Sequence, residues 1–240
     1  MELTTAIARR RMVRDFEPDP LPPGELDELL DLARRAPSAG NSQAAAFVVL
    51  DEPELVARYW DTTLPEPRRE RFRWQGLLQA PALVLVTTRP EAYVSRYAEA
   101  DKAATGRGDG AHRWPVPYWW VDAGAVVQNV LLLAVARRWG ACLFGPFDHE
   151  PALRRAFDLD DDLRLVATIA LGHPRPDEPG RSAGRRRQPV EVALQFMRQQ
   201  ADKAMAEAGG IDPVEAGHAA LERQEPPVGR RQQRGVGNIG

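Results

Sequence analysis

The sequence predicts one domain of mixed helix and strand, in the α/β or α+β class, followed by a polar tail. Three observations predict it: an amphipathic helical pattern near the N-terminus, three short runs rich in β-branched residues, and a long apolar helical pattern between the second and third runs. The chain has 240 residues, which suits one domain with a sizeable core.

Three segments have helical patterns. Residues 3–9 predict a short first helix, and "PPGELDELLDLARRA" at residues 22–36 predicts a second. The second begins after Pro-Pro-Gly, and its one apolar face holds Leu26, Leu29, Leu30 and Ala33. The segment "VDAGAVVQNVLLLAVARRWGA" at residues 121–141 is apolar nearly all round, as expected of a central core helix.

Strands are predicted at "AAFVVLD" (residues 45–51), "ALVLVTT" (residues 82–88) and "LRLVATIALG" (residues 163–172). Between the second and third strands, residues 89–118 form a long polar insertion with Gly106, Gly108 and Gly110, which predicts a mobile loop or lid over a site. Residues 200–240 lack aromatic side chains and are rich in Gly, Pro, Gln and Arg. We expect a domain over residues 1–199 and a largely disordered or extended tail over residues 200–240.

Composition narrows the function classes. The formal charge of −2 and the pI near 6.1 give no overall attraction to nucleic acid or anionic lipid. No run approaches the roughly 18 apolar residues of a membrane span, and no secretory pattern is present, so we expect a cytoplasmic protein. The single Cys142 and four scattered histidines lack ligand spacing, so we expect no metal, and Cys142 is more consistent with a core position than with a nucleophile.

Two arginine clusters flank this neutral chain, "ARRRMVRDF" at residues 8–16 and "GRRRQPV" at residues 184–190. Arg10 and Arg14 would share a face if the first helix continued. A solvated basic helix end is the alternative interpretation. Because Arg is suited to bidentate phosphate contacts, convergence of the two clusters would hold a small phosphomonoester.

The segment "RAPSAGNSQ" at residues 35–43 carries many hydrogen-bonding side chains between a helix and a strand. A helix stop with a turn is the simple interpretation. However, "RRRMVRDF" and "APSAGNSQ", followed in order by "APALVLV", "DAGAVVQNVLLLAVARRWGACLFGPF" and "ATIALGHPRP…RRRQPVEV", resemble the FMN-dependent nitroreductase family. The resemblance covers roughly residues 3–196. It implies an α+β, three-layer fold with a central mixed sheet flanked by helices, in an intertwined homodimer.

The resemblance also implies which residues contact FMN. The loop residues Pro37, Ser38, Asn41 and Gln43 would contact the flavin held chiefly by the other subunit, because amide and hydroxyl groups satisfy its polar edge without adding charge. Other implied contacts are to the phosphate (Arg10, Arg185 and Arg187), the ribityl chain (Arg11 and Met12), the N1/O2 side of the ring (Arg14) and the region of N5 (Phe144 and Gly145). Arg186 is interpreted as a solvated neighbour.

Some features depart from the family pattern. Met12 replaces the usual Ser, and "QAAAF" lacks the Pro-Trp that often follows the Gln. The aromatic residues Tyr118, Trp119 and Trp120 either stack on a substrate or pack against the core.

The implied activity is hydride transfer from NADPH or NADH through FMN to a nitroaromatic, a quinone or a similar small molecule, by a ping-pong mechanism. No side chain is assigned as catalytic; the chemistry occurs at flavin N5, and a cation at Arg14 would raise the reduction potential. No dinucleotide fingerprint follows a predicted strand. The alternatives are flavin-cleaving or dehalogenating chemistry on the same fold, and a flavin-binding protein without turnover.

Overall fold

The computed structural model describes residues 1–178, 180 and 183–189. Met1–Gly180 form one compact unit, and Arg181–Gly240 fall in a second, in which residues 183–189 are exposed. The predicted tail at residues 200–240 lies outside the described residues, and the predicted domain boundary at residue 199 stays a prediction.

The first unit contains helices on both sides of a sheet. Its helices and strands are, in chain order, α1 (Leu3–Arg9), α2 (Glu25–Ala33), β1 (Ala46–Leu50), α3 (Pro53–Thr63), β2 (Ala82–Thr88), α4 (Pro90–Ala98), α5 (Tyr118–Ala136), β3 (Gly140–Phe144), α6 (Glu150–Ala156) and β4 (Arg164–Gly172). The predictions of helices at residues 3–9, 22–36 and 121–141 and of the three strands are confirmed.

The described strands form an open sheet in the order β1-β2-β4-β3, with every neighbouring pair antiparallel. The prediction of a mixed sheet is therefore wrong for these strands. β2 and β3 do run in the same direction, because both pair antiparallel with β4. However, β4 lies between them in the sheet, so β2 and β3 are not hydrogen-bonded to each other and form no parallel pair.

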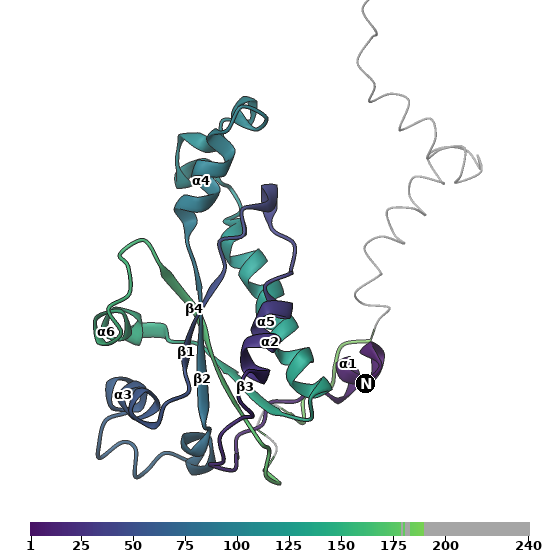
Figure 1. Cartoon of the computed structure of the whole chain (residues 1–240), viewed down its shortest axis with the longest axis vertical. Helices are drawn as coiled ribbons and strands as arrows, with labels where there is room; N and C mark the ends of the chain where they lie inside the picture. The colour runs from purple at the N-terminus through teal and green to yellow at the C-terminus, as the bar shows by residue number, and fades with distance from the viewer. Residues whose placement is uncertain (179, 181–182, 190–240) are drawn as a thin grey trace, which may run out of the picture. The chain divides into compact units, whose positions relative to one another are not determined.

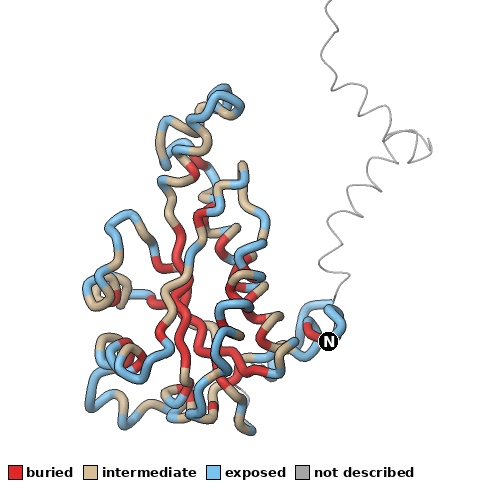
Figure 2. Tube along the Cα trace, viewed as in Figure 1, coloured by how far each residue is buried: buried red, intermediate tan, exposed pale blue. Residues whose placement is uncertain are grey.

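The sheet is the middle of three layers (Figure 1). One layer is made by α2 and α5, and the opposite layer by α3 and α6. Alternation along β2 explains why this strand is buried throughout: Val84 faces α2 and α5, whereas Leu83 and Leu85 face the other layer. In Figure 2 the buried segments accordingly lie along the strands and on the helix faces that look toward them.

The helix α5 is the most apolar of the described helices. It is the one helix within the described part of the chain whose length and composition would suffice to cross a bilayer. Seven of its residues are buried, several of them in the core cluster with α2 and the sheet, as predicted for a core helix.

The insertion at residues 89–118 is more ordered than the predicted loop. It contains α4 and three short 3-10 turns at Ala103–Thr105, Arg107–Asp109 and Ala111–Arg113. Tyr93 and Trp114 of the insertion form a small buried aromatic cluster with Trp119 of α5. Tyr97, also in the insertion, packs on Trp114 at a centroid distance of 4.7 Å. The glycines permit its tight turns, but the aromatic residues at its two ends give it a core of its own.

Candidate functional site

Residues 10–14 lie along the edge strand β3. Val13 donates its backbone N–H to the carbonyl of Ala141 at 2.9 Å, and the Leu143 N–H donates to the Met12 sulfur at 3.3 Å. Because α1 ends at Arg9, Arg10 and Arg14 do not share a helical face. The segment instead runs as extended chain antiparallel to β3, and the side chain of Arg14 reaches the space beside the C-terminal end of that strand.

An aromatic cavity of about 350 Å³ opens at this end of β3. It brings together three of the predicted site residues, Arg14, Phe144 and Gly145. Its volume lies within the range of small-molecule sites. Much of the remaining wall is aromatic, being formed in part by Tyr59, Trp60, Phe72, Trp74 and Phe147. We call this space the aromatic cavity.

A second hollow, of about 390 Å³, also includes Arg14 and Trp74 in its wall, and we call it the polar groove. The guanidinium carbon of Arg14 lies 5.2 Å from the centroid of the Trp74 ring, and that of Arg73 lies 4.4 Å from it. The groove also holds the carboxylates of Asp15, Asp177 and Glu178. Arg14 therefore stands between an apolar space and a polar one, as a residue contacting the polar edge of a flat ligand would.

Asp177 lines the polar groove, and the sequence interpretation did not single it out. Its side chain is 3% exposed, forms an ion pair with Arg11, and accepts the backbone N–H of Arg14 at 2.7 Å. This carboxylate fixes the backbone from which the Arg14 side chain projects. Only its place shortly after a predicted strand could have drawn attention to it.

The loop that contains Pro37, Ser38, Asn41 and Gln43 has an unusual backbone. Asn41 and Gln43 have φ angles of 56° and 49°, in the left-handed region that residues other than Gly rarely adopt. The Ser38 hydroxyl accepts the N–H of Gln43 at 2.9 Å, so it supports the loop from within. Strained backbone of this kind persists where the surroundings hold it, often at functional sites.

Two neighbouring elements hold this loop. From α5, the Asp122 carboxylate accepts the N–H of Ala39 and the hydroxyl proton of Tyr93, each at 2.8 Å. From α4, Arg96 donates through Nε to the carbonyl of Gly40 at 2.8 Å. Gly40 is required there, because its φ is 64° and a Cβ would lie 2.7 Å from the ring of Tyr97. Tyr97 and Arg96 thus give the insertion a supporting role beside the loop.

The structure does not bring the two groups of predicted residues together within one chain. The loop precedes β1, whereas Gly145 follows β3, and β1 and β3 are the opposite edges of the described sheet. Pro37, Ser38 and Gln43 line a separate cavity of about 90 Å³ with Tyr93 and Asp122.

The remaining predicted residues fall into three groups. Arg10 is half-buried at the end of α1. Arg185 and Arg187 are exposed, as is Arg186, and belong to the second unit, so their convergence with Arg10 stays a prediction. Among the three aromatic residues at the start of α5, Trp119 packs in the aromatic cluster, Trp120 is half-buried and Tyr118 is exposed.

Cys142 lies on β3 and is buried. Burial raises the pKa of its thiol to about 11, so the thiol stays protonated at neutral pH. The interpretation of Cys142 as a core residue agrees with this environment.

The chain is similar to proteins of known family. The sequence model of the Nitroreductase family matches residues 7–173. A 4-nitrobenzoate reductase of Nocardioides sp. (strain LMS-CY) is 30% identical over 225 residues, which cover 82% of this chain and 91% of the relative. A 5,6-dimethylbenzimidazole synthase of Rhodobacter capsulatus is 26% identical over 185 residues, which cover 72% of this chain and 83% of the relative.

A solved structure has the same fold. A protein of Exiguobacterium sibiricum 255-15, assigned as a nitroreductase and crystallised in complex with FMN, superposes with a TM-score of 0.63 at 19% identity. The match covers 80% of this chain and 96% of that one.

Proposed function

The chain belongs to the nitroreductase family, and we propose that it passes hydride from NADPH or NADH through FMN to a small organic acceptor such as a nitroaromatic or a quinone. Family membership makes it an oxidoreductase with FMN as cofactor. The observation that carries the finer proposal is the aromatic cavity, in which Arg14, Phe144 and Gly145 meet beside the polar groove.

The residues around the aromatic cavity fit a bound flavin in two respects, the hydrogen-bond donors of Arg14 and the absence of a side chain at Gly145. Among the described residues, the recorded side-chain hydrogen bond of Arg14 is a long one of 3.4 Å to the Met12 carbonyl, which leaves guanidinium donors for a ligand. Gly145 has no side chain at the end of β3, and the ring of the exposed Phe147 lies so close that a Cβ would be 2.9 Å from it, so the backbone there accepts a closely packed flat ring. FMN, when bound, supplies the hydride-transfer chemistry, and Arg14 would stabilise negative charge on the ring.

We further propose that the site is completed by a second copy of the chain in a homodimer. The loop at residues 37–43 and the aromatic cavity lie at opposite edges of one sheet, so a loop contact with the flavin requires the partner subunit. The helix α5 leaves an exposed apolar side chain at Val121, beside exposed Gly124 and Gln128, on which such a partner can pack. An FMN-loaded monomer in sedimentation experiments would contradict the proposal.

A second candidate function is oxidative cleavage of the flavin. It is favoured by the similarity to a protein named 5,6-dimethylbenzimidazole synthase, at 26% identity. A flavin-binding protein without turnover is the third candidate.

Steady-state kinetics with 4-nitrobenzoate and a quinone separates these functions. The rate is measured while nicotinamide and acceptor are varied together, and a ping-pong enzyme gives parallel lines in a double-reciprocal plot. Oxygen-dependent loss of bound FMN without acceptor reduction would support cleavage. FMN binding with no turnover of any acceptor would support the third candidate.

A further inference from the structure

We propose that the chain has a second ligand site, a cavity of about 790 Å³ between α3 and the segment before β2, which takes a small aromatic amine in its cationic form. One wall is the face of α3 that carries Val56, Ala57 and Trp60, and the floor includes Leu78 and Pro81. We call this space the α3 cavity. Among the described residues, Trp60 alone lines both the α3 cavity and the aromatic cavity, so the two spaces adjoin at this residue.

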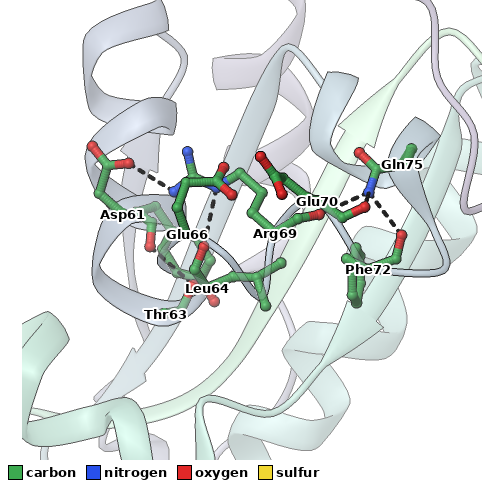
Figure 3. A network of polar contacts seen from close by, with 9 residues as sticks. Asp61, Thr63, Leu64, Glu66, Arg69, Glu70, Phe72 and Gln75 are labelled. Carbon is green, nitrogen blue, oxygen red and sulfur yellow. Dashed lines mark hydrogen bonds and ion pairs between the residues drawn. The ribbon is translucent and has the colours of Figure 1, made fainter.

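The outer wall of the α3 cavity is held in shape by the protein itself. Arg69 donates through Nη2 to Asp61 at 2.7 Å and through Nε to the Leu64 carbonyl at 3.0 Å. Gln75 donates to the carbonyls of Arg69 and Phe72, each at 2.8 Å. Figure 3 shows these contacts joining the end of α3 to the segment that follows it. The cavity is therefore preformed, which reduces the entropy cost of binding.

The charges around the α3 cavity favour a cation. Its lining includes the carboxylates of Asp51, Glu66 and Glu70 and a single guanidinium, that of Arg69. Arg69 is already paired with Asp61, and its Nε lies 3.8 Å from the nearest Glu66 oxygen. A cationic ligand would therefore meet an excess of negative charge.

Trp60 is the aromatic side chain in the wall of the α3 cavity, and an aromatic ligand can pack beside it. Its side chain is almost fully enclosed, with the residue 7% exposed, so its position is fixed. The indole stacks on Phe144, with 5.9 Å between centroids, while the adjacent Val56 and Pro81 offer apolar surface.

The test uses full-length protein purified with FMN and labelled with ¹⁵N in its tryptophan side chains. The chain has six tryptophans, and Trp60→Phe identifies the Trp60 indole signal as the one that disappears. Titration with 4-(aminomethyl)benzamide, which carries an ammonium and an amide oxygen, should shift that signal to saturation. The matched anion 4-carboxybenzamide should bind about tenfold more weakly or not at all, because the carboxylates repel it.

A double variant, Glu66→Gln with Glu70→Gln, removes two negative charges without altering size and should weaken the amine about fivefold, since exposed charge pairs contribute up to about 1 kcal/mol. Equal affinity for the amine and the anion would overturn the proposal. So would an amine that shifts only other tryptophan signals. The proposed oxidoreductase activity is assayed separately and does not depend on either result.

Discussion

The Asp122 carboxylate on α5 accepts a hydrogen bond of 2.8 Å from the backbone N–H of Ala39, in the loop proposed to contact flavin. Tyr93 donates to the same carboxylate oxygen. Asp122→Ala should lower the free energy of local loop opening by about 1.5–3 kcal/mol, because a hydrogen bond to a charged group is lost. Hydrogen exchange of the amides at residues 38–43 measures the change. Tyr93→Phe is the matched control, since it keeps the bond to Ala39, and equal exchange in the two variants would argue against this role for Asp122.

Phosphate anchoring predicts a difference between two flavins. If Arg187 contacts the FMN phosphate, Arg187→Ala should weaken FMN binding by about 1.5–3 kcal/mol and leave riboflavin almost unchanged. Titration of the apoprotein with each flavin measures both affinities. Arg186→Ala, the proposed solvated neighbour, should change neither. An equal loss for FMN and riboflavin would refute the assignment of Arg187.

Arg14 is expected to tune the flavin ring. Arg14→Gln keeps a donor but removes the charge, so a loss of about 1.4 kcal/mol would make the two-electron potential roughly 30 mV more negative. Flavin reduction should slow about tenfold if most of this loss appears in the transition state. Potentiometry on FMN-loaded protein measures the shift, and Arg14→Lys should restore much of it. An unchanged potential and rate would place Arg14 away from the ring.

Cys142 should be chemically inert in the folded protein. Burial raises the pKa of its thiol to about 11, so the reactive thiolate forms only as the pH approaches that value. Iodoacetamide at neutral pH should therefore leave Cys142 unmodified in native protein and alkylate it in denaturant, as judged by mass spectrometry. Rapid alkylation of native protein would show that Cys142 is accessible and ionised.

The sequence predicts the fold best where one residue pattern determines the structure. The apolar faces of α2 and α5 and the β-branched runs of β1, β2 and β4 were found because burial imposes those patterns. The edge strand β3 was missed, because its five residues "GACLF" begin with two small residues and have little β-branched character. The antiparallel sheet also escaped prediction, since strand order depends on contacts distant in sequence.

The site was predicted unevenly for the same reason. Arg14, Phe144 and Gly145 were predicted from a resemblance, and the structure gathers them around one cavity. Asp122 and Asp177 were missed, because their partners lie 83 and 163 residues away in sequence, at Ala39 and Arg14. The aromatic residues of the insertion lay in a polar segment, so their packing into a cluster with Trp119 was not evident from its composition.

The central claim is that bound FMN accepts hydride from a nicotinamide and passes it to an organic acceptor. Anaerobic mixing of FMN-loaded protein with NADPH, and separately with NADH, tests this directly through the visible absorbance of the flavin. We predict bleaching with at least one nicotinamide and recovery of the absorbance when 4-nitrobenzoate or a quinone is added. Flavin that stays bound and oxidised in the presence of both nicotinamides would contradict the account.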